Sequence, residues 1–267
     1  MKTRISSAII ITAIFVPFLL IGGIPFAVFM SAMSICGLYE LFKVREMQRP
    51  FPTFLKLIAY VIVALVCLNN FTSIEFKSSF EYRTMAFIIF LFLSPMVFIN
   101  DLKKYGFNDA LFLIGSVLFI GLSFNLIIIT RNFDLSYIIY LLLITVMTDT
   151  FALVTGMLIG KNKLCPKISP NKTVEGLIGG LLMGTFVSTA FYVTVINPQI
   201  PLVLAVCVSL VLCLVAVLGD LVFSAIKRDY AIKDFSKLIP GHGGILDRFD
   251  SLIFVTLAFI VILEVIL

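Results

Sequence analysis

The stretch Pro201–Ile226 reads PLVLAVCVSLVLCLVAVLGDLVFSAI and contains one charged residue, Asp220. A helix needs about 20 predominantly apolar residues to cross the hydrocarbon core of a bilayer, at a rise of about 1.5 Å per residue. A run this long and this apolar therefore predicts a transmembrane helix.

The composition of the whole chain extends this prediction to the rest of the molecule. Of its 267 residues, 61% are hydrophobic and only 13% are charged, whereas an ordinary soluble domain has about 45–50% apolar and about 25% charged residues. This excludes a water-soluble globule. The five cysteines form no CxxC pair, so we expect neither a disulfide framework nor a zinc site. The net charge of +5 comes without a long basic tail, so no nucleic-acid partner is expected.

Apolar runs of sufficient length predict about nine transmembrane helices, and hence an all-α, polytopic membrane protein. Residues 1–135 are expected to form a scaffold of membrane helices, and residues 136–267 to combine membrane helices with catalytic loops. The predicted spans are Ile5–Gly22, Ile24–Phe42, Phe54–Asn70, Met85–Ile99, Phe107–Thr130, Ser136–Gly160, Val174–Ile196, Pro201–Ile226 and Phe249–Leu267.

Basic residues are distributed unequally between the loops that these nine spans define. Of the 20 lysines and arginines, only Lys77, Arg83 and Arg131 fall on the side opposite the N-terminus. Because cytoplasmic loops carry the excess of basic residues, the N-terminus is expected to be cytoplasmic and the C-terminus not. The two cytoplasmic loops after residue 160 are also rich in polar residues and glycine, so we expect the chemistry at this face.

Asp149 and Asp220 lie within apolar runs. An ionised carboxylate at the centre of a spanning helix costs about 2.5–3.5 kcal/mol on insertion scales, so each acid is a candidate site residue. Ser224, Lys227 and Arg228 follow Asp220 at spacings of 4, 7 and 8 residues, which places all four on one helix face. The alternatives are helix-packing carboxylates and an interfacial Lys-Arg anchor.

The next segment, Lys233–Asp250, reads KDFSKLIPGHGGILDRFD. Gly241, Gly243 and Gly244 permit backbone conformations with positive φ, and the N–H groups that such a run exposes can bind a phosphate. His242 is the only histidine of the chain. It is either an incidental surface residue or a hydrogen-bond donor to a phosphate or leaving group.

Asp247 and Asp250 follow the glycines at the start of the last predicted helix, three residues apart and therefore on one face. Paired carboxylates beside a phosphate-binding backbone suggest Mg²⁺, which prefers carboxylate and phosphate oxygens. The alternative is that helix N-termini simply favour acids. With Asp220 and the supporting Asp149, the expected metal ligands are Asp149, Asp220, Asp247 and Asp250.

The other cytoplasmic loop, residues 160–176, reads GKNKLCPKISPNKTVEG. Its lysines and hydroxyl groups suit a polyphosphate. The alternative is an ordinary basic cytoplasmic loop in which Ser169 or Thr173 caps the next helix.

These motifs together resemble a known family. The ordered set Ser224-x-x-Lys227-Arg228-x4-Lys233-Asp234, Pro240-Gly-His242-Gly-Gly and Asp247-Arg248-x-Asp250 resembles the signature of phosphatidate cytidylyltransferases, also called CDP-diacylglycerol synthases. Asp149-Thr-Phe-Ala and Ser169-Pro-x-Lys172-Thr173-x-Glu175-Gly176 resemble further pieces of the same family.

The resemblance implies an enzyme of phospholipid biosynthesis that converts phosphatidate and CTP to CDP-diacylglycerol and pyrophosphate at the cytoplasmic face of the cell membrane. It implies Mg²⁺ as cofactor, with a second monovalent or divalent cation left open, and phosphatidate, CTP and the bilayer as partners, with a homodimer as one assembly. The implied catalytic residues are Asp220, Lys227, Arg228, Asp247 and Asp250. The implied substrate-binding residues are Lys161, Ser169, Lys172, Thr173, Glu175, Ser224, Lys233, Asp234, His242, Gly243, Gly244 and Arg248.

Two other functions remain open at this point. A CTP-dependent lipid kinase would need the same metal and basic groups but would transfer the γ-phosphoryl group to an alcohol. A secondary transporter would use Asp149 and Asp220 as ion-coupling residues. Transporters usually show internal repeats with sites at the midplane, whereas here the polar groups gather toward one surface and no repeat is visible.

Overall fold

The computed structural model describes residues 2–50, 52–69, 82–99, 101–239, 241 and 243–266. The chain forms two compact units. Unit 1 comprises Met1–Phe133 and Phe235–Leu246, and unit 2 comprises Asp134–Asp234 and Asp247–Leu267. The glycine-containing segment Phe235–Leu246 thus packs with the N-terminal helices, although it lies far from them in the sequence.

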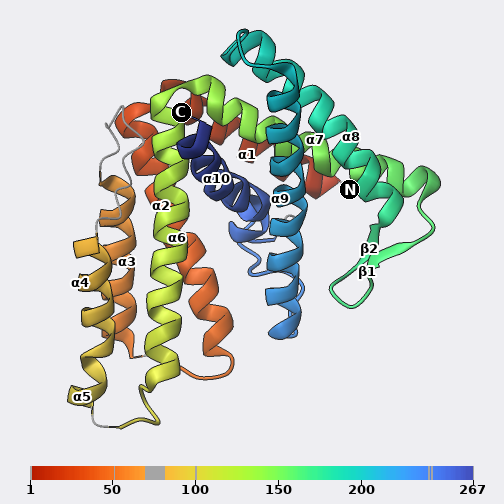
Figure 1. Cartoon of the computed structure of the whole chain (residues 1–267). Coiled ribbons are helices and arrows are strands. Elements are labelled where there is room, and N and C mark those ends of the chain that lie inside the picture. Colours follow the sequence, from red (N-terminus) through yellow and green to blue (C-terminus); the bar gives the residue numbers. More distant parts are fainter. Residues whose placement is uncertain are drawn as a thin grey trace. The chain divides into compact units, whose positions relative to one another are not determined.

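Unit 1 is a bundle of helices in which α6 contacts α2, α3 and α4, and Figure 1 shows α3, α4 and α6 side by side. Its core consists of aliphatic and aromatic side chains such as Phe42, Phe92 and Phe124. At one end of α6, the buried Asp109 pairs with Arg45 at 3.1 Å and Arg49 at 3.0 Å. The helices are α1 (Lys2–Ile21), α2 (Gly23–Glu46), α3 (Thr53–Leu68), α4 (Tyr82–Leu93), α5 (Pro95–Ile99) and α6 (Phe107–Phe133).

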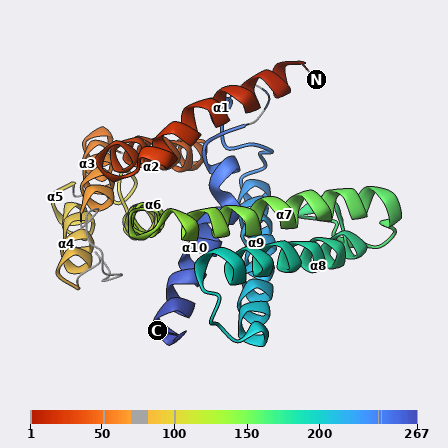
Figure 2. The same ribbon diagram turned by 90° about the horizontal axis from the view of Figure 1, so that it is seen from above.

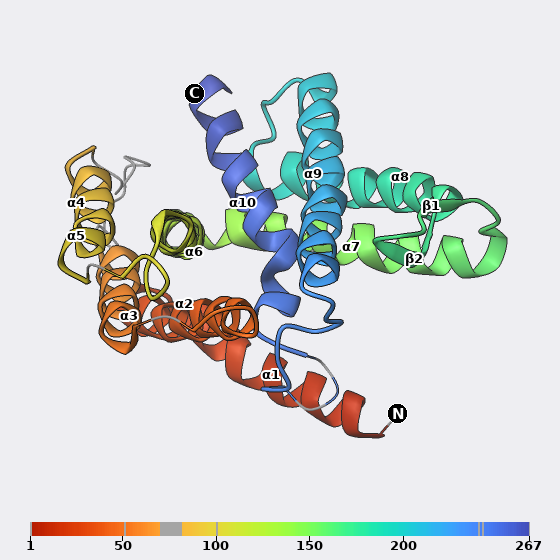
Figure 3. The same cartoon turned by 90° about the horizontal axis from the view of Figure 1, so that it is seen from below.

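Unit 2 is built on the antiparallel pair α7 and α8, which lie side by side in Figures 2 and 3 and are joined by a β-hairpin. The long helix α9 packs on both of them. Helix α10 packs on α9, with Phe254 edge-on to Phe223 at a ring separation of 6.1 Å. The elements are α7 (Leu135–Ile159), β1 (Lys163–Cys165), β2 (Ser169–Thr173), α8 (Val174–Phe191) with a π-helical turn (Tyr192–Ile196), α9 (Leu202–Asp229) and α10 (Leu246–Ile266).

Small residues let α7 and α8 approach closely. A Cβ placed on Gly180 of α8 would lie 2.6 Å from the carbonyl oxygen of Thr148 and 2.9 Å from Cβ of Ala152, both on α7. Close backbone contact at small residues is the usual way in which helices associate in lipid, where no hydrophobic force drives them together.

The described residues contain six helices long and apolar enough to cross a membrane, which confirms a multi-pass, all-α architecture. The count of nine and the orientation remain predictions. The expected span Met85–Ile99 lies within the candidate span Tyr82–Ile99. A turn at Ser94 divides this span into α4 and α5 and places Pro95 at the first position of α5, where its missing N–H is tolerated. The six are Gly23–Glu46, Tyr82–Ile99, Phe107–Phe133, Leu135–Ile159, Val174–Ile196 and Leu202–Asp229.

We expect Gly180→Ala to destabilise the protein by about 1–3 kcal/mol, because the added methyl group overpacks the α7–α8 contact. Gly115→Ala on α6 is the matched control, since a Cβ there meets no atom within 4 Å. It should be neutral or stabilising, as Ala is the better helix former. Thermal unfolding in detergent compares the two; equal melting temperatures would contradict this account of the packing.

Candidate active site

In unit 2, β2 places a lysine against an acid of α9. The amine of Lys172 lies 2.5 Å from Oδ2 of Asp220, and each side chain is 25% exposed. Ser224, one turn further along α9, donates a hydrogen bond of 3.3 Å to the same carboxylate. Asp220, the acid of the apolar run, therefore forms an ion pair with a lysine of the hairpin. Such a partner is expected, because an ionised carboxylate in an apolar helix is costly to insert into a membrane.

A second ion pair joins α9 to α10. Nζ of Lys227 lies 2.7 Å from Oδ1 of Asp247, and the two side chains are only 11% and 4% exposed. Arg228, the next residue, turns elsewhere and donates to the carbonyl oxygens of Ile168 at 3.2 Å and Ile232 at 3.1 Å. The predicted basic stripe of α9 thus divides into one side chain beside the acids and one that connects the hairpin to the end of α9.

Two further acids complete this charged cluster. The carboxylates of Asp149 and Asp250 repel each other and that of Asp220, while Lys172 and Arg248 attract Asp149 and Lys227 attracts Asp250. In the part of the chain that the structure describes, neither Asp149 nor Asp250 has an ion-pair partner within 4 Å. The structure therefore gathers all four predicted acids with Lys172, Lys227 and Arg248.

A glycine brings two of the acid-bearing helices together. A Cβ on Gly219, next to Asp220, would lie 2.8 Å from Cβ of Phe254 and 3.2 Å from the carbonyl oxygen of Asp250. Only a residue without a side chain allows α10 to approach α9 at this level. The repulsion between Asp220 and Asp250 follows from that close approach.

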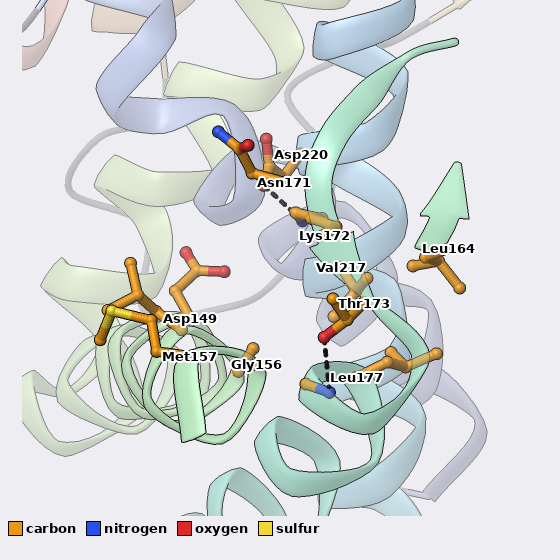
Figure 4. Close-up of a pocket in the computed structure, with 13 residues that line it drawn as sticks. Asp149, Gly156, Met157, Leu164, Asn171, Lys172, Thr173, Leu177, Val217 and Asp220 are labelled. Carbon is orange, nitrogen blue, oxygen red and sulfur yellow. Dashed lines mark hydrogen bonds and ion pairs between the residues drawn. The ribbon is translucent and has the colours of Figure 1, made fainter. Parts of the chain in front are cut away.

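A cavity of about 540 Å³ opens beside the Lys172–Asp220 pair, a volume typical of small-molecule sites. Figure 4 shows the carboxylate of Asp149 pointing from α7 toward the side of the cavity where Asp220 and Lys172 lie. Most of the remaining wall is apolar. The lining residues are Asp149, Ala152, Leu153, Gly156, Met157, Leu164, Asn171, Lys172, Thr173, Gly176, Leu177, Val217 and Asp220.

The donor set suits a hard cation, because the acids offer carboxylate oxygen alone. The part of the chain that the structure describes contains no group of three His, Cys, Asp or Glu side chains close enough to hold a metal ion. Mg²⁺ is commonly bound by one or two carboxylates together with substrate phosphates. The residues thus fit Mg²⁺ as part of a metal–phosphate complex rather than a preformed cage of protein ligands.

The other predicted residues of the 160–176 loop support the hairpin. Thr173 accepts a 3.1 Å hydrogen bond from the backbone N–H of Gly176 and caps α8, which confirms one of the two expected caps. Glu175 accepts backbone hydrogen bonds from Lys161 at 3.1 Å and Asn162 at 3.2 Å. Ser169, also predicted, begins β2.

The remaining predicted residues lie in the segment after α9. Lys233 and Asp234 are exposed in unit 2. Gly243 belongs to unit 1 and has the positive φ that the sequence predicts, +83°. Gly241, also expected, has a positive φ of +80°, whereas Gly244 is buried and has no positive φ. His242 and Pro240 lie outside the described residues.

Sequence reasoning missed one acid, Glu40 of α2. Its carboxylate is completely buried and accepts hydrogen bonds from the segment that contains the glycines. The signal was present, because Glu40 stands in the predicted span Ile24–Phe42 just as Asp149 and Asp220 stand in theirs. An acid in an apolar run is expected to have a compensating partner.

Known proteins resemble this chain over almost its whole length. A model of the cytidylyltransferase family matches residues 2–266. Proteins named phosphatidate cytidylyltransferase from Staphylococcus haemolyticus and Staphylococcus aureus (strain COL) are each 38% identical, covering 96% of both chains. The protein of that name from Bacillus subtilis is 34% identical over 96% of this chain and 94% of its own. The chain belongs to the cytidylyltransferase family.

Proposed function

We propose that this protein is a phosphatidate cytidylyltransferase, which converts CTP and phosphatidate to CDP-diacylglycerol and pyrophosphate. The observation that carries the proposal is the cluster of four acids and several cations in unit 2, three members of which, Asp149, Lys172 and Asp220, line a largely apolar cavity. Such a cavity suits a substrate that is both charged and lipidic. The names of the relatives supply the specific reaction.

The proposed reaction is a substitution at the α-phosphorus of CTP. A phosphate oxygen of phosphatidate forms a bond to this phosphorus, the bond between it and the oxygen that bridges to the β-phosphorus breaks, and pyrophosphate leaves with that oxygen. The attacking oxygen is already ionised near neutral pH, so no general base is required. The main barrier is the repulsion among phosphates, which fixed cations lower by stabilising the developing charge.

Each charged side chain then has a defined task. Lys172, Lys227 and Arg248 bind phosphate oxygens, and the first two are already held by ion pairs with Asp220 and Asp247. Arg228 would have to leave its backbone carbonyl partners, or bind phosphate with its remaining N–H groups.

The acids would hold Mg²⁺ together with the substrate phosphates. Asp220, Asp247 and Asp250 are the proposed ligands, and Asp149 is a supporting carboxylate. The bound ion would supply positive charge to the phosphates. A second cation, monovalent or divalent, belongs to the same proposal.

The apolar wall indicates how phosphatidate would enter. Leu153, Met157 and Leu177 line the cavity beside the charged edge, so a lipid headgroup could reach the charges while its acyl chains remain among apolar side chains. By the distribution of basic residues, the charged edge would face the cytoplasm, where CTP is available. The cell membrane is the proposed location.

Product identification tests the proposal directly. We expect purified protein in detergent, given phosphatidate, labelled CTP and Mg²⁺, to form CDP-lipid and pyrophosphate, and a chelator to stop the reaction. A lipid kinase would release CDP and a phospholipid that lacks cytidine. Absence of any CTP turnover by folded protein would contradict an enzymatic role, and turnover unaffected by the chelator would contradict the metal.

We expect Asp247→Asn to lower turnover by at least about 100-fold, because it removes a carboxylate that acts on the reacting charges. The protein should still fold and insert, since Asn keeps the size of the side chain. The turnover and the gel-filtration profile of Asp247→Asn are compared with those of a control variant, Asp101→Asn. Asp101 is an exposed acid in a surface ion pair with Lys104, so its loss should change neither. Full activity of Asp247→Asn would refute the assignment.

Lys172→Met should raise the KM of a phosphate-bearing substrate by about 10- to 100-fold, the effect of losing one hydrogen bond between charged groups. Lys163→Met is the matched control, because Lys163 is an exposed lysine of the same hairpin. Initial rates at varied CTP and varied phosphatidate show which substrate Lys172 binds. If Lys172→Met has the same KM for CTP and the same KM for phosphatidate as Lys163→Met, a role for Lys172 in substrate binding is contradicted.

A further inference from the structure

Glu40 belongs to α2 of unit 1 and has none of its surface exposed. One carboxylate oxygen accepts hydrogen bonds from Oγ of Ser236 at 2.6 Å and the backbone N–H of Ile245 at 2.8 Å. The other oxygen accepts from the backbone N–H of Leu246 at 2.9 Å. A single side chain of α2 thus binds both ends of the segment 235–246, almost 200 residues further along the chain.

Leu246 is the first residue of α10. The first N–H groups of a helix have no partner within the helix, and the helix dipole favours a negative charge there. The carboxylate of Glu40 meets both requirements. Because Glu40 occupies the N–H groups of Ile245 and Leu246, these two groups are not available to a substrate phosphate.

The backbone around Glu40 is shaped for this contact. A Cβ on Gly244 would collide with both carboxylate oxygens of Glu40, so only glycine fits there. Gly243 has positive φ and accepts a 2.9 Å hydrogen bond from Ile239, which closes the turn. The glycine-rich turn therefore has a structural requirement besides any contact with phosphate.

The residue that follows Leu246 in the chain is Asp247, and Asp250 lies one helical turn later. Both belong to the rigid helix whose first residue Glu40 holds. A shift at the start of α10 would therefore be carried to these acids through the helix backbone. Displacements of about 1 Å at a reacting centre can cost about 100-fold in rate.

We infer that Glu40 is a positioning residue for the proposed cytidylyl transfer: by binding the N–H groups of Ile245 and Leu246, it holds the backbone conformation of the first turn of α10, which carries Asp247 and Asp250. The inference rests on the proposed function. Glu40 itself does not touch the reacting atoms. Its effect should appear in turnover by folded enzyme rather than in the amount of folded protein.

Glu40→Gln is the sharpest variant, because it keeps the size of the side chain but leaves a single acceptor oxygen. The second oxygen becomes an NH₂ group, which cannot accept from Leu246 or Ile245. We expect kcat per folded molecule to fall at least about 10-fold, with KM for CTP changed less than kcat. Backbone amides of the peptide 243–250 should exchange with deuterium faster than in the unmodified protein.

Asp109→Asn is the matched control. Asp109 is another buried acid of unit 1, paired with Arg45 and Arg49, and the proposed reaction assigns it no role. We expect this variant to lower the melting temperature at least as much as Glu40→Gln, while kcat and the exchange of peptide 243–250 stay unchanged. If Glu40→Gln does not fold, Ser236→Ala takes its place, because it removes one donor to Glu40. For Ser236→Ala we expect a smaller fall in kcat and again faster deuterium exchange of peptide 243–250.

The inference is overturned if Glu40→Gln, or Ser236→Ala in its place, keeps the unmodified kcat, or if kcat falls equally in Asp109→Asn. Failure of the proposed function would look different, since the unmodified protein would then form no CDP-lipid. In that case the deuterium exchange still tells whether Glu40 holds the start of α10.

Discussion

The neutralisation of carboxylates set into apolar helices is the constraint on which unit 2 depends. Asp149, Asp220 and Asp250 repel one another on three different helices, each of which is rich in apolar residues. Cations must therefore come from the chain itself. The hairpin supplies Lys172 and the C-terminal end of α9 supplies Lys227, so the charged loops are required by the helices that they connect.

The same constraint explains why this site suits crowded phosphates. Each lysine is already paired with an acid, so a substrate that brings phosphates and a divalent cation together exchanges one set of opposite charges for another. The lysines and their partners Asp220 and Asp247 would keep opposite charges beside them during this exchange. A largely apolar cavity lies beside the Lys172–Asp220 pair, which suits the proposed lipid substrate.

Much of this architecture could be predicted from sequence, because hydropathy fixes where helices lie and the acids Asp149 and Asp220 stand out against apolar neighbours. The partner of each acid could not be predicted. Lys172 pairs with Asp220 because residues 163–173 form a β-hairpin, whereas the sequence predicted only a loop there. The place of segment 235–246 in unit 1 could not be predicted either, because it depends on three hydrogen bonds to Glu40, which lies far away in the sequence. Such long-range contacts leave no local pattern.

A structure of the protein in a lipid nanodisc with CTP and Mg²⁺ would be the most direct measurement of the central claim. The account predicts density for the triphosphate in contact with Lys172 or Lys227, and density for a cation between it and the carboxylates of α9 and α10. Triphosphate density at another place, with the Lys172–Asp220 and Lys227–Asp247 pairs intact and no cation beside them, would contradict it.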